Sequence, residues 1–300
     1  MRLVSYRTHS QERWVAGLEE NGLVLAGSAV YTSADRHVEQ PPTVRELLEA
    51  GPEVLATVCA NARSIFAAGK QDLLPLDSLE IGPPIPDPDK IVCMGLNYAD
   101  HAAEANMAIP EVPVLFAKFR NSLTGPSGAI VLPRNSTAVD YEAELSVVIG
   151  KTCKDVAEKD ALSYVAGYTI MNDVSARDLQ MRTPQWTAGK ALDTFAPMGP
   201  GIVPASEIPD PQNLTVITRL NGQERQHGHT SQMIFSIAKA IAFISSIMTL
   251  VPGDIIATGT PSGVGFIQKP PIFLREGDLV EVEIEHVGRI ANRVVAPSHS

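Results

Sequence analysis

The chain reads Val139-Asp140-Tyr141-Glu142-Ala143-Glu144-Leu145-Ser146-Val147-Val148-Ile149 near its middle, an apolar run that contains acids. The run predicts a strand buried on both faces, because its second half is largely apolar. Alternate residues of a strand share a face about 6.5 Å apart, so Glu142 and Glu144 are expected to converge on one spot. Burying two like charges together is costly unless a proton, a basic partner or a metal ion compensates.

A Glu-x-Glu pair also has a simpler explanation, in which both side chains lie on the solvated face of an edge strand and pair with surface Lys or Arg. The apolar run into Gly150 argues for burial instead. A third acid, Asp173, ends another apolar run, residues 167–174, and three carboxylates on strands make a hard-cation site. Mg²⁺ or Mn²⁺ fits such ligands best, with Ca²⁺ as a substitute, because no Cys or His stands nearby to indicate zinc.

The composition is that of an ordinary globular enzyme, with 300 residues, 44% hydrophobic and 19% charged. A net charge of −10 and a pI near 5.2 argue against a nucleic-acid partner, because phosphate binding requires clustered Lys and Arg. The N-terminus lacks the apolar core of a signal peptide, and no apolar stretch is long enough to span a membrane. We therefore expect a cytoplasmic protein that does not bind membranes, with an organellar matrix as the alternative location.

Three cysteines without Cys-x-x-Cys spacing indicate reduced thiols.

A proline-rich segment, residues 82–90, predicts a boundary, because its four prolines disfavour helix and central strand. Residues 1–80 are expected to form a small N-terminal α+β domain, and residues 81–300 a larger one. In the first domain Thr43 is a candidate N-cap, with Glu46 three residues on. The elements expected there are strands at 3–6, 14–18 and 23–25 and helices at 43–50 and 52–68.

Short β-rich runs separated by Gly and Pro turns dominate the larger part, as in a barrel or sandwich. One helix is expected from Ser231 to Met248, because apolar residues recur there at spacings of four and three, with Thr230 and Ser231 as candidate caps. The strand pattern thus predicts a β-rich α+β fold of the barrel or sandwich type. The expected strands cover residues 91–94, 114–118, 145–149, 164–171, 214–220, 255–258 and 279–284.

His101 and Glu104 closely follow one of these expected strands. Because they are three residues apart on a helical turn, they share a face and can hydrogen-bond. A histidine oriented by a carboxylate is a competent general acid or base near neutral pH. An isolated pair of this kind is more often a surface ion pair. A catalytic interpretation therefore depends on the motifs that accompany it.

Several motifs together resemble the fumarylacetoacetate hydrolase family over residues 80–295. In family order they are Gly95-Leu96-Asn97-Tyr98-x-x-His101-x-x-Glu104, Pro113-Val114-Leu115-Phe116-x-Lys118, Asp140-Tyr141-Glu142-x-Glu144-Leu145, Asn172-Asp173-Val174-Ser175-Ala176-Arg177-Asp178-x-Gln180, Gly189-Lys190-x-x-Asp193 and Pro252-Gly253-Asp254-x-Ile256-x-Thr258-Gly259-Thr260-Pro261-x-Gly263-Val264-Gly265. The first eighty residues match only loosely, in the manner of a variable cap.

The resemblance implies a mixed β roll, usually a homodimer, whose catalytic domain spans residues 81–300. It implies that Glu142, Glu144 and Asp173 bind Mg²⁺ or Mn²⁺. His101 and Glu104 would form an acid–base dyad on a mobile lid.

The resemblance also implies a set of pocket residues. Arg177, Gln180 and Lys190 would line the pocket, where Lys190 adds positive charge and Arg177 holds a remote carboxylate. Thr260 and the backbone N–H groups from Gly259 onward would hold a substrate carboxylate. The Ala-rich stretch 102–108 is expected to fold as a short lid helix.

Each pocket residue has a simpler alternative. Arg177 and Asp178 are explained as a surface ion pair, and Lys190 as a solvated side chain. The glycine loop 259–265 lacks phosphate-binding spacing and is by default a tight turn. The histidines at 227 and 229 lack an acidic partner in sequence, which favours a surface loop.

A small 2-oxo acid is the expected substrate, because its C1 carboxylate and C2 carbonyl can occupy the open positions of a three-carboxylate metal. The first expectation is a metal-dependent hydrolase that cleaves the C–C bond of acylpyruvate-like 1,3-diketo acids, with His101 activating water. The same enolate chemistry serves an oxaloacetate or tricarboxylate decarboxylase and a 2-hydroxymuconate-type isomerase, such as one acting on 2-hydroxyhepta-2,4-diene-1,7-dioate. A non-catalytic metabolite-binding protein is the remaining alternative.

Overall fold

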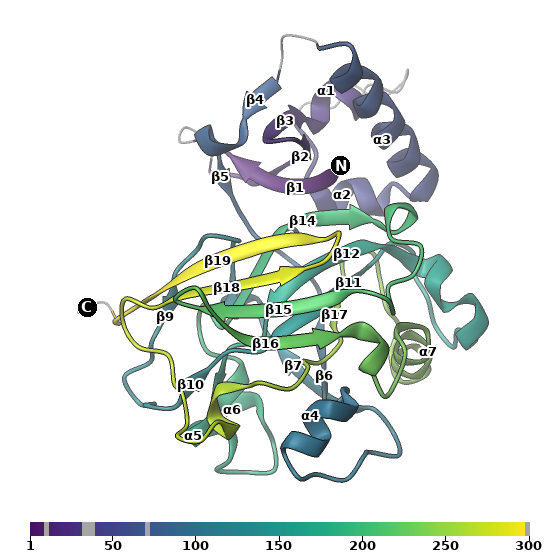
Figure 1. The fold of residues 1–300 in the computed structure, drawn as a ribbon. Coiled ribbons are helices and arrows are strands. Elements are labelled where there is room, and N and C mark those ends of the chain that lie inside the picture. Colours follow the sequence, from purple (N-terminus) through teal and green to yellow (C-terminus); the bar gives the residue numbers. More distant parts are fainter. Residues whose placement is uncertain (9–11, 32–39, 70–72, 298–300) are drawn as a thin grey trace.

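The computed structural model describes residues 1–8, 12–31, 40–69 and 73–297. A twelve-stranded mixed sheet runs from the N-terminal part of the chain to the edge strand β7 (Figure 1). In spatial order its strands are β4 (Leu73–Pro75), β3 (Leu23–Ala26), β2 (Val15–Glu20), β1 (Arg2–Arg7), β14 (Ala196–Pro204), β12 (Val165–Asn172), β11 (Ala143–Ile149), β17 (Ile255–Ala257), β6 (Ile91–Gly95) and β7 (Val114–Lys118), while β5 (Glu80–Ile81) pairs with β1 and β8 (Leu123–Thr124) with β14.

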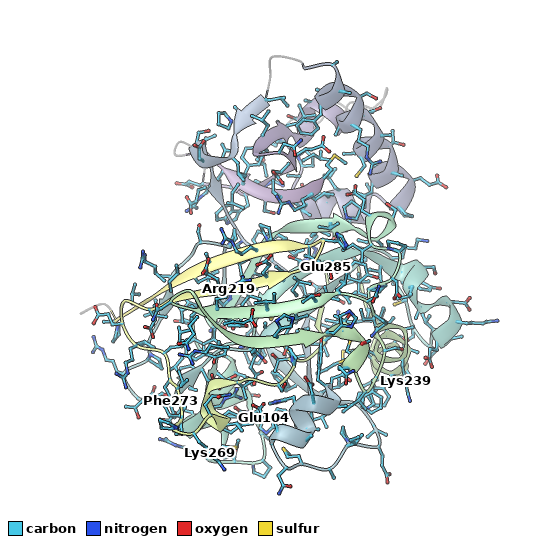
Figure 2. All side chains as sticks on the ribbon, in the orientation of Figure 1. Glu104, Arg219, Lys239, Lys269, Phe273 and Glu285 are labelled. Carbon is cyan, nitrogen blue, oxygen red and sulfur yellow. The ribbon has the colours of Figure 1, made fainter. Side chains whose placement is uncertain are left out.

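A second sheet of five strands packs against the large one. In its strands β15 and β18 buried residues alternate with half-buried ones, which is the pattern of a strand with one face on a core. On the other side, polar side chains such as Arg219 face solvent (Figure 2). The order of this sheet is β16 (Gln223–His229), β15 (Thr215–Leu220), β18 (Leu279–Ile284), β19 (Gly288–Val295) and β9 (Ile130–Val131), and a separate pair is formed by β10 (Val139–Asp140) and β13 (Ser175–Ala176).

Strand β11 is buried along its whole length. Leu145 packs into the core between the two sheets, together with Val216 and Val282. Val148 points the other way, into a second core that includes Leu3. The expected burial on both faces is confirmed, and so is the β-rich α+β fold class.

Helices are few and mostly short. In α2 the sequence-predicted capping box is present: the Glu46 N–H donates to the Thr43 hydroxyl over 3.1 Å, and the Thr43 N–H donates to the Glu46 carboxylate over 2.7 Å. The helices are α1 (Gly27–Tyr31), α2 (Val44–Glu49), α3 (Pro52–Ala67), α4 (Ala99–Glu104), α5 (Arg177–Gln180), α6 (Thr187–Lys190) and α7 (Ile237–Ile247), and 3₁₀ turns cover Leu76–Ser78, Arg120–Ser122, Glu158–Tyr164, Ala205–Glu207, Thr230–Gln232 and Gly265–Ile267.

The helix expected from Ser231 begins later, at Ile237. Its N-cap is Ser236, whose hydroxyl accepts the N–H of Lys239 over 3.2 Å. The residues before Ser236 are not helical, because Met233 pairs with Tyr98 in an isolated β-bridge. The sequence prediction was therefore wrong about the first residue and the N-cap of this helix. The long-range contact with Tyr98 holds Met233 in an extended conformation, so the helix cannot begin before it.

The N-terminal strands join the large sheet directly. Strand β1 pairs with β2 and β5 in the first part of the chain and with β14 in the second, where Leu3 lies opposite Ile202. The division at residue 80 stays a prediction.

All three cysteines are buried and unpaired. Across the described residues, no helix has the length and apolar character needed to cross a bilayer.

Candidate active site

Three buried carboxylates meet at the beginning of β11. Glu142 precedes the strand, Glu144 is its second residue, and Asp173 follows β12, the antiparallel neighbour of β11. One oxygen atom from each side chain lies within 4.8 Å of the others. The backbone fixes this arrangement, because the Asp173 N–H donates to the Glu142 carbonyl over 2.8 Å and the Glu142 N–H donates to the Asn172 side-chain oxygen over 3.0 Å. The sequence prediction that these acids converge is confirmed.

Two basic side chains pair with Glu142. The Lys190 ammonium lies 2.8 Å from the Glu142 carboxylate and 2.6 Å from that of Asp173. A guanidinium nitrogen of Arg177 lies 2.6 Å from the other Glu142 oxygen. Burial opposes the charge of Glu142, but Arg177 and Lys190 outweigh it and hold the pKa of this carboxyl well below its usual range. Lys190 is itself buried, so the alternative of a solvated lysine is wrong.

Glu144 has a different environment. Within the described parts of the chain it forms no ion pair, and its carboxylate accepts the Gly259 N–H over 2.9 Å. Burial raises its pKa well above the usual range, and the nearby charges of Asp173 and Glu142 add to this. This cluster of oxygen donors, with one buried carboxylate unpaired, fits a hard divalent cation such as Mg²⁺ or Mn²⁺.

Lys118, at the end of β7, belongs to the site, although no role was predicted for it from the sequence. Its side chain has no exposed surface, and its ammonium lies 2.7 Å from Asp173. It also donates to the carbonyl oxygens of Val174, over 3.1 Å, and of Lys190. Burial lowers the pKa of Lys118, although Asp173 favours its charged form. The sequence feature that could have identified this residue is a lysine at the end of an apolar strand.

Arg177 is buried and directed inward, toward protein carboxylates. Its guanidinium bonds Asp140 over 2.9 and 3.1 Å, donates to the Gln180 side-chain oxygen over 3.1 Å and stacks 4.3 Å from the Phe266 ring. Asp178 instead accepts hydrogen bonds from the Ser136 hydroxyl and the Thr137 N–H. The alternative of a surface Arg177–Asp178 pair is therefore wrong, while a role of Arg177 and Gln180 in substrate binding stays a prediction.

The glycine loop 259–265 holds acidic side chains of the protein. Gly259 donates its N–H to Glu144, and the Gly263 N–H lies 3.0 and 3.1 Å from the two Glu104 oxygens. Both glycines have positive φ, +92° and +101°, which other residues rarely adopt. Gly265 donates to Asp140 over 2.8 Å. Most of the donors expected to bind substrate are thus engaged within the protein.

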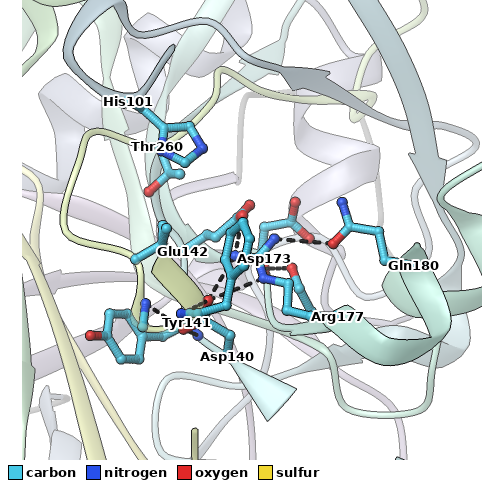
Figure 3. Close-up of polar contacts among 12 residues, drawn as sticks. His101, Asp140, Tyr141, Glu142, Asp173, Arg177, Gln180 and Thr260 are labelled. Carbon is cyan, nitrogen blue, oxygen red and sulfur yellow. Dashed lines mark hydrogen bonds and ion pairs between the residues drawn. The ribbon is translucent and has the colours of Figure 1, made fainter. Parts of the chain in front are cut away.

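The proposed acid–base residues lie on α4. His101 Nδ1 is 3.5 Å from a Glu104 oxygen, and the histidine side chain is 10% exposed. Figure 3 shows His101 and Thr260 on one side of Glu142, with Arg177 and Gln180 on the other. The helix covers Ala99–Glu104, so the expected helix at 102–108 was placed too late. Asn106, with φ of 52°, stops it from continuing.

One expectation about two histidines was wrong, and one residue of the quoted motifs has a structural role. His227 and His229 were assigned to a surface loop, but both lie on β16, where His227 contacts Glu224 and His229 contacts Ser231. Asn97 was quoted only as part of a motif. Its amide donates to the carbonyls of Phe235 and Thr258, which ties the segment before α4 to the glycine loop.

Comparison with known proteins identifies relatives along the whole chain. The sequence model of the fumarylacetoacetate (FAA) hydrolase C-terminal family matches residues 90–295. The chain is 44% identical to "Oxaloacetate tautomerase Fahd2a, mitochondrial" of Rattus norvegicus over 296 residues, which is 98% of this chain and 92% of the relative.

Solved structures agree with this relationship. A 2-hydroxyhepta-2,4-diene-1,7-dioate isomerase from Mycobacterium marinum is 34% identical, with a TM-score of 0.73 and full coverage of both chains. A maleylpyruvate hydrolase from Sphingobium sp. SYK-6, in complex with manganese (II) ion and pyruvate, is 29% identical, with a TM-score of 0.79 and coverage of 99% of this chain and 100% of that one.

Proposed function

The chain belongs to the fumarylacetoacetate hydrolase family, and from this premise we propose that it is a divalent-metal-dependent tautomerase of 2-oxo acids, with oxaloacetate as the first substrate to test. The observation that carries the proposal is the buried carboxylate triad with Lys190 bound to two of its members. The choice of reaction is supported by the similarity to an oxaloacetate tautomerase over 98% of the chain. C–C bond hydrolysis, the first expectation from sequence, becomes the second candidate.

The proposed metal ligands are Glu142, Glu144 and Asp173. Mg²⁺ or Mn²⁺ in this site supplies Lewis acidity toward the carboxylate and carbonyl oxygens of a 2-oxo acid. The Lys190 ammonium, held against Glu142 and Asp173, adds a fixed positive charge beside the substrate oxygen on which negative charge develops. Because these groups are buried, water screens their charges little.

His101 is the proposed acid–base group. Tautomerisation breaks a C–H bond at C3 of the substrate and delivers a proton to the oxygen at C2. In the proposed mechanism His101 Nε2 removes the C3 proton and returns it to that oxygen, while Nδ1 faces Glu104. The Glu104 carboxylate, 3.5 Å from Nδ1, is proposed to orient the imidazole ring.

The first test is turnover of oxaloacetate, followed by the ultraviolet absorbance of its enol. We expect EDTA-treated protein to lose activity and added Mg²⁺ or Mn²⁺ to restore it. Glu144→Gln and His101→Gln are each expected to lower kcat about 10²- to 10⁴-fold. The matched control is His227→Gln, because this exposed histidine lies outside the site. An activity insensitive to EDTA, or a fully active Glu144→Gln variant, would contradict the proposal.

The second candidate is hydrolysis of an acylpyruvate, and it is favoured by the histidine–glutamate pair beside the triad. In that reaction His101 removes a proton from water that attacks the distal carbonyl. The same samples separate the possibilities: tautomerisation releases no carbon, decarboxylation releases CO₂, and hydrolysis of an acylpyruvate releases pyruvate and a second acid. A protein that only binds metabolites turns over none of these substrates.

A further inference from the structure

Gln226, on β16, connects the glycine loop to the start of β11, next to the acids. Its side chain has no exposed surface and forms four hydrogen bonds. The oxygen accepts the N–H of Ala143, over 3.0 Å, and the hydroxyl of Thr218, over 2.7 Å. The nitrogen donates to the hydroxyl of Thr260, over 2.8 Å, and to the carbonyl of Pro261, over 2.9 Å.

Two backbone groups fix the orientation of this amide. The N–H of Ala143 can only donate a hydrogen bond, so the atom that faces it must be the oxygen of Gln226. The carbonyl of Pro261 can only accept one, so the atom that faces it must be the nitrogen. The amide nitrogen is therefore the group directed at Thr260 as a donor.

This orientation determines what the Thr260 hydroxyl can do. Since the hydroxyl oxygen already accepts an N–H from Gln226, its own hydrogen is left to donate. Among the residues that the structure describes, this hydroxyl has no acceptor. Thr260 is 4% exposed and follows Gly259, which binds Glu144. A buried O–H group without an acceptor is unfavourable, and a ligand oxygen would remove that cost.

We propose that Gln226 is a positioning residue that sets the Thr260 hydroxyl as a donor, so that this part of the pocket selects a substrate oxygen acceptor, such as a carboxylate, over a donor group. The inference rests on the proposed action on 2-oxo acids. It also explains why the amide reaches Ala143, which lies between Glu142 and Glu144: the hydroxyl is held at a fixed place relative to the triad.

The test uses the full-length, metal-loaded protein with Gln226→Met and Thr260→Val, alone and combined. Each single variant should raise KM for oxaloacetate roughly tenfold or more while kcat changes much less, because a hydrogen bond to a charged group is lost in ground and transition states alike. The double variant should be no worse than Thr260→Val, since both changes remove the same interaction. Thr260→Ser, which keeps the hydroxyl, should retain most of the affinity.

The matched control is Thr218→Val. It also removes a hydrogen bond of Gln226, but on the oxygen side, away from Thr260. It should lower the free energy of unfolding and leave KM within about twofold. A structural role for Gln226 alone would instead make the effects of Gln226→Met and Thr218→Val alike.

Binding of oxalate to Mn²⁺-loaded protein, measured by calorimetry, gives a readout without turnover. Gln226→Met should weaken oxalate and leave Mn²⁺ affinity unchanged, and Gln226→Glu, which keeps the shape but offers Thr260 an acceptor, should weaken oxalate further. Additive effects with Thr260→Val, an unchanged oxalate affinity, or loss of the fold in both Gln226 variants would overturn the inference.

The two proposals fail separately. If wild-type protein turns over no 2-oxo acid but Gln226→Met weakens oxalate binding, the proposed reaction is wrong and the inference stands. If turnover is normal and Gln226→Met has an unchanged KM, the inference alone is wrong. If the wild-type protein neither binds oxalate nor turns over oxaloacetate, both are contradicted.

Discussion

Lys118 illustrates how single residues balance charge in this site. Its ammonium lies between Asp173 and two backbone carbonyls, with no exposed atom. The buried groups of the site comprise four acids and three bases, namely Asp140, Glu142, Glu144, Asp173, Lys118, Arg177 and Lys190. The acids exceed the bases by one, which a bound cation would compensate.

Replacing Lys118 by Met should therefore destabilise the protein. The change leaves Asp173 with one ion pair fewer and two buried carbonyls without this donor, and breaking a buried pair costs about 3–5 kcal/mol. The measurement is urea unfolding of the metal-free protein. Lys151→Met, at an exposed lysine, is the control and should change the free energy of unfolding by less than about 0.5 kcal/mol. Equal free energies of unfolding in the two variants would show that the contacts of Lys118 do not stabilise the fold by this amount.

At the scale of elements, α4 and the glycine loop form one unit. Asp100 accepts the Ser262 hydroxyl over 3.0 Å, and Glu104 accepts the Gly263 N–H. His101 lies between these two acids on the helix. A movement of α4 as a lid must therefore break these contacts or carry the loop, and Thr260 with it.

The start of α7 gives a test at this scale. Ser236→Ala removes the side chain that caps the helix and should cost about 1 kcal/mol in thermal or urea unfolding. Ser231→Ala, at the cap expected from sequence, is the comparison and should cost clearly less, because Ser231 lies in a 3₁₀ turn before the helix. The reverse order of the two costs would place the helix start at the earlier serine.

At the scale of the whole molecule, strand β7 is the last strand at one end of the large sheet, and no other strand of the described residues pairs with its free side. Exposed apolar side chains flank it: Ile109, Val112 and Phe119 are 61%, 60% and 53% exposed. An uncovered apolar edge is suited to pair with another chain. The homodimer expected from the family resemblance stays a prediction, and this edge is the interface that we test for it.

Light scattering should then give twice the chain mass of 32.1 kDa. Phe119→Asp combined with Ile109→Asp should shift the mass toward that of one chain, because charges on this edge oppose pairing. Leu162→Asp, at an exposed leucine in the 158–164 turn, is the control and should leave the mass unchanged. A wild-type mass of one chain would contradict the dimer, and an unchanged mass in the double variant would move the interface elsewhere.

Local patterns along the chain were enough to predict many individual strands and helices. The strand at 279–284 and the capping box of Thr43 and Glu46 follow from residues that are neighbours in sequence. Alternation along a strand predicted that Glu142 and Glu144 converge. Glu142 in fact lies just before β11, where hydrogen bonds to Asn172 and Asp173 hold it. Missed strands such as β14, with two glycines and three prolines, carry no clear alternating pattern.

The sequence by itself determined the β-rich fold class and the burial of β11, and its family resemblance implied that Glu142, Glu144 and Asp173 meet. Only the tertiary structure decided which partners those acids have: Lys118 and Lys190 at Asp173, and an amide of the glycine loop at Glu144. The physical reason is that periodicity acts between neighbours in sequence, whereas hydrogen bonds and ion pairs form between side chains that the folded backbone brings within a few ångströms, from segments far apart along the chain.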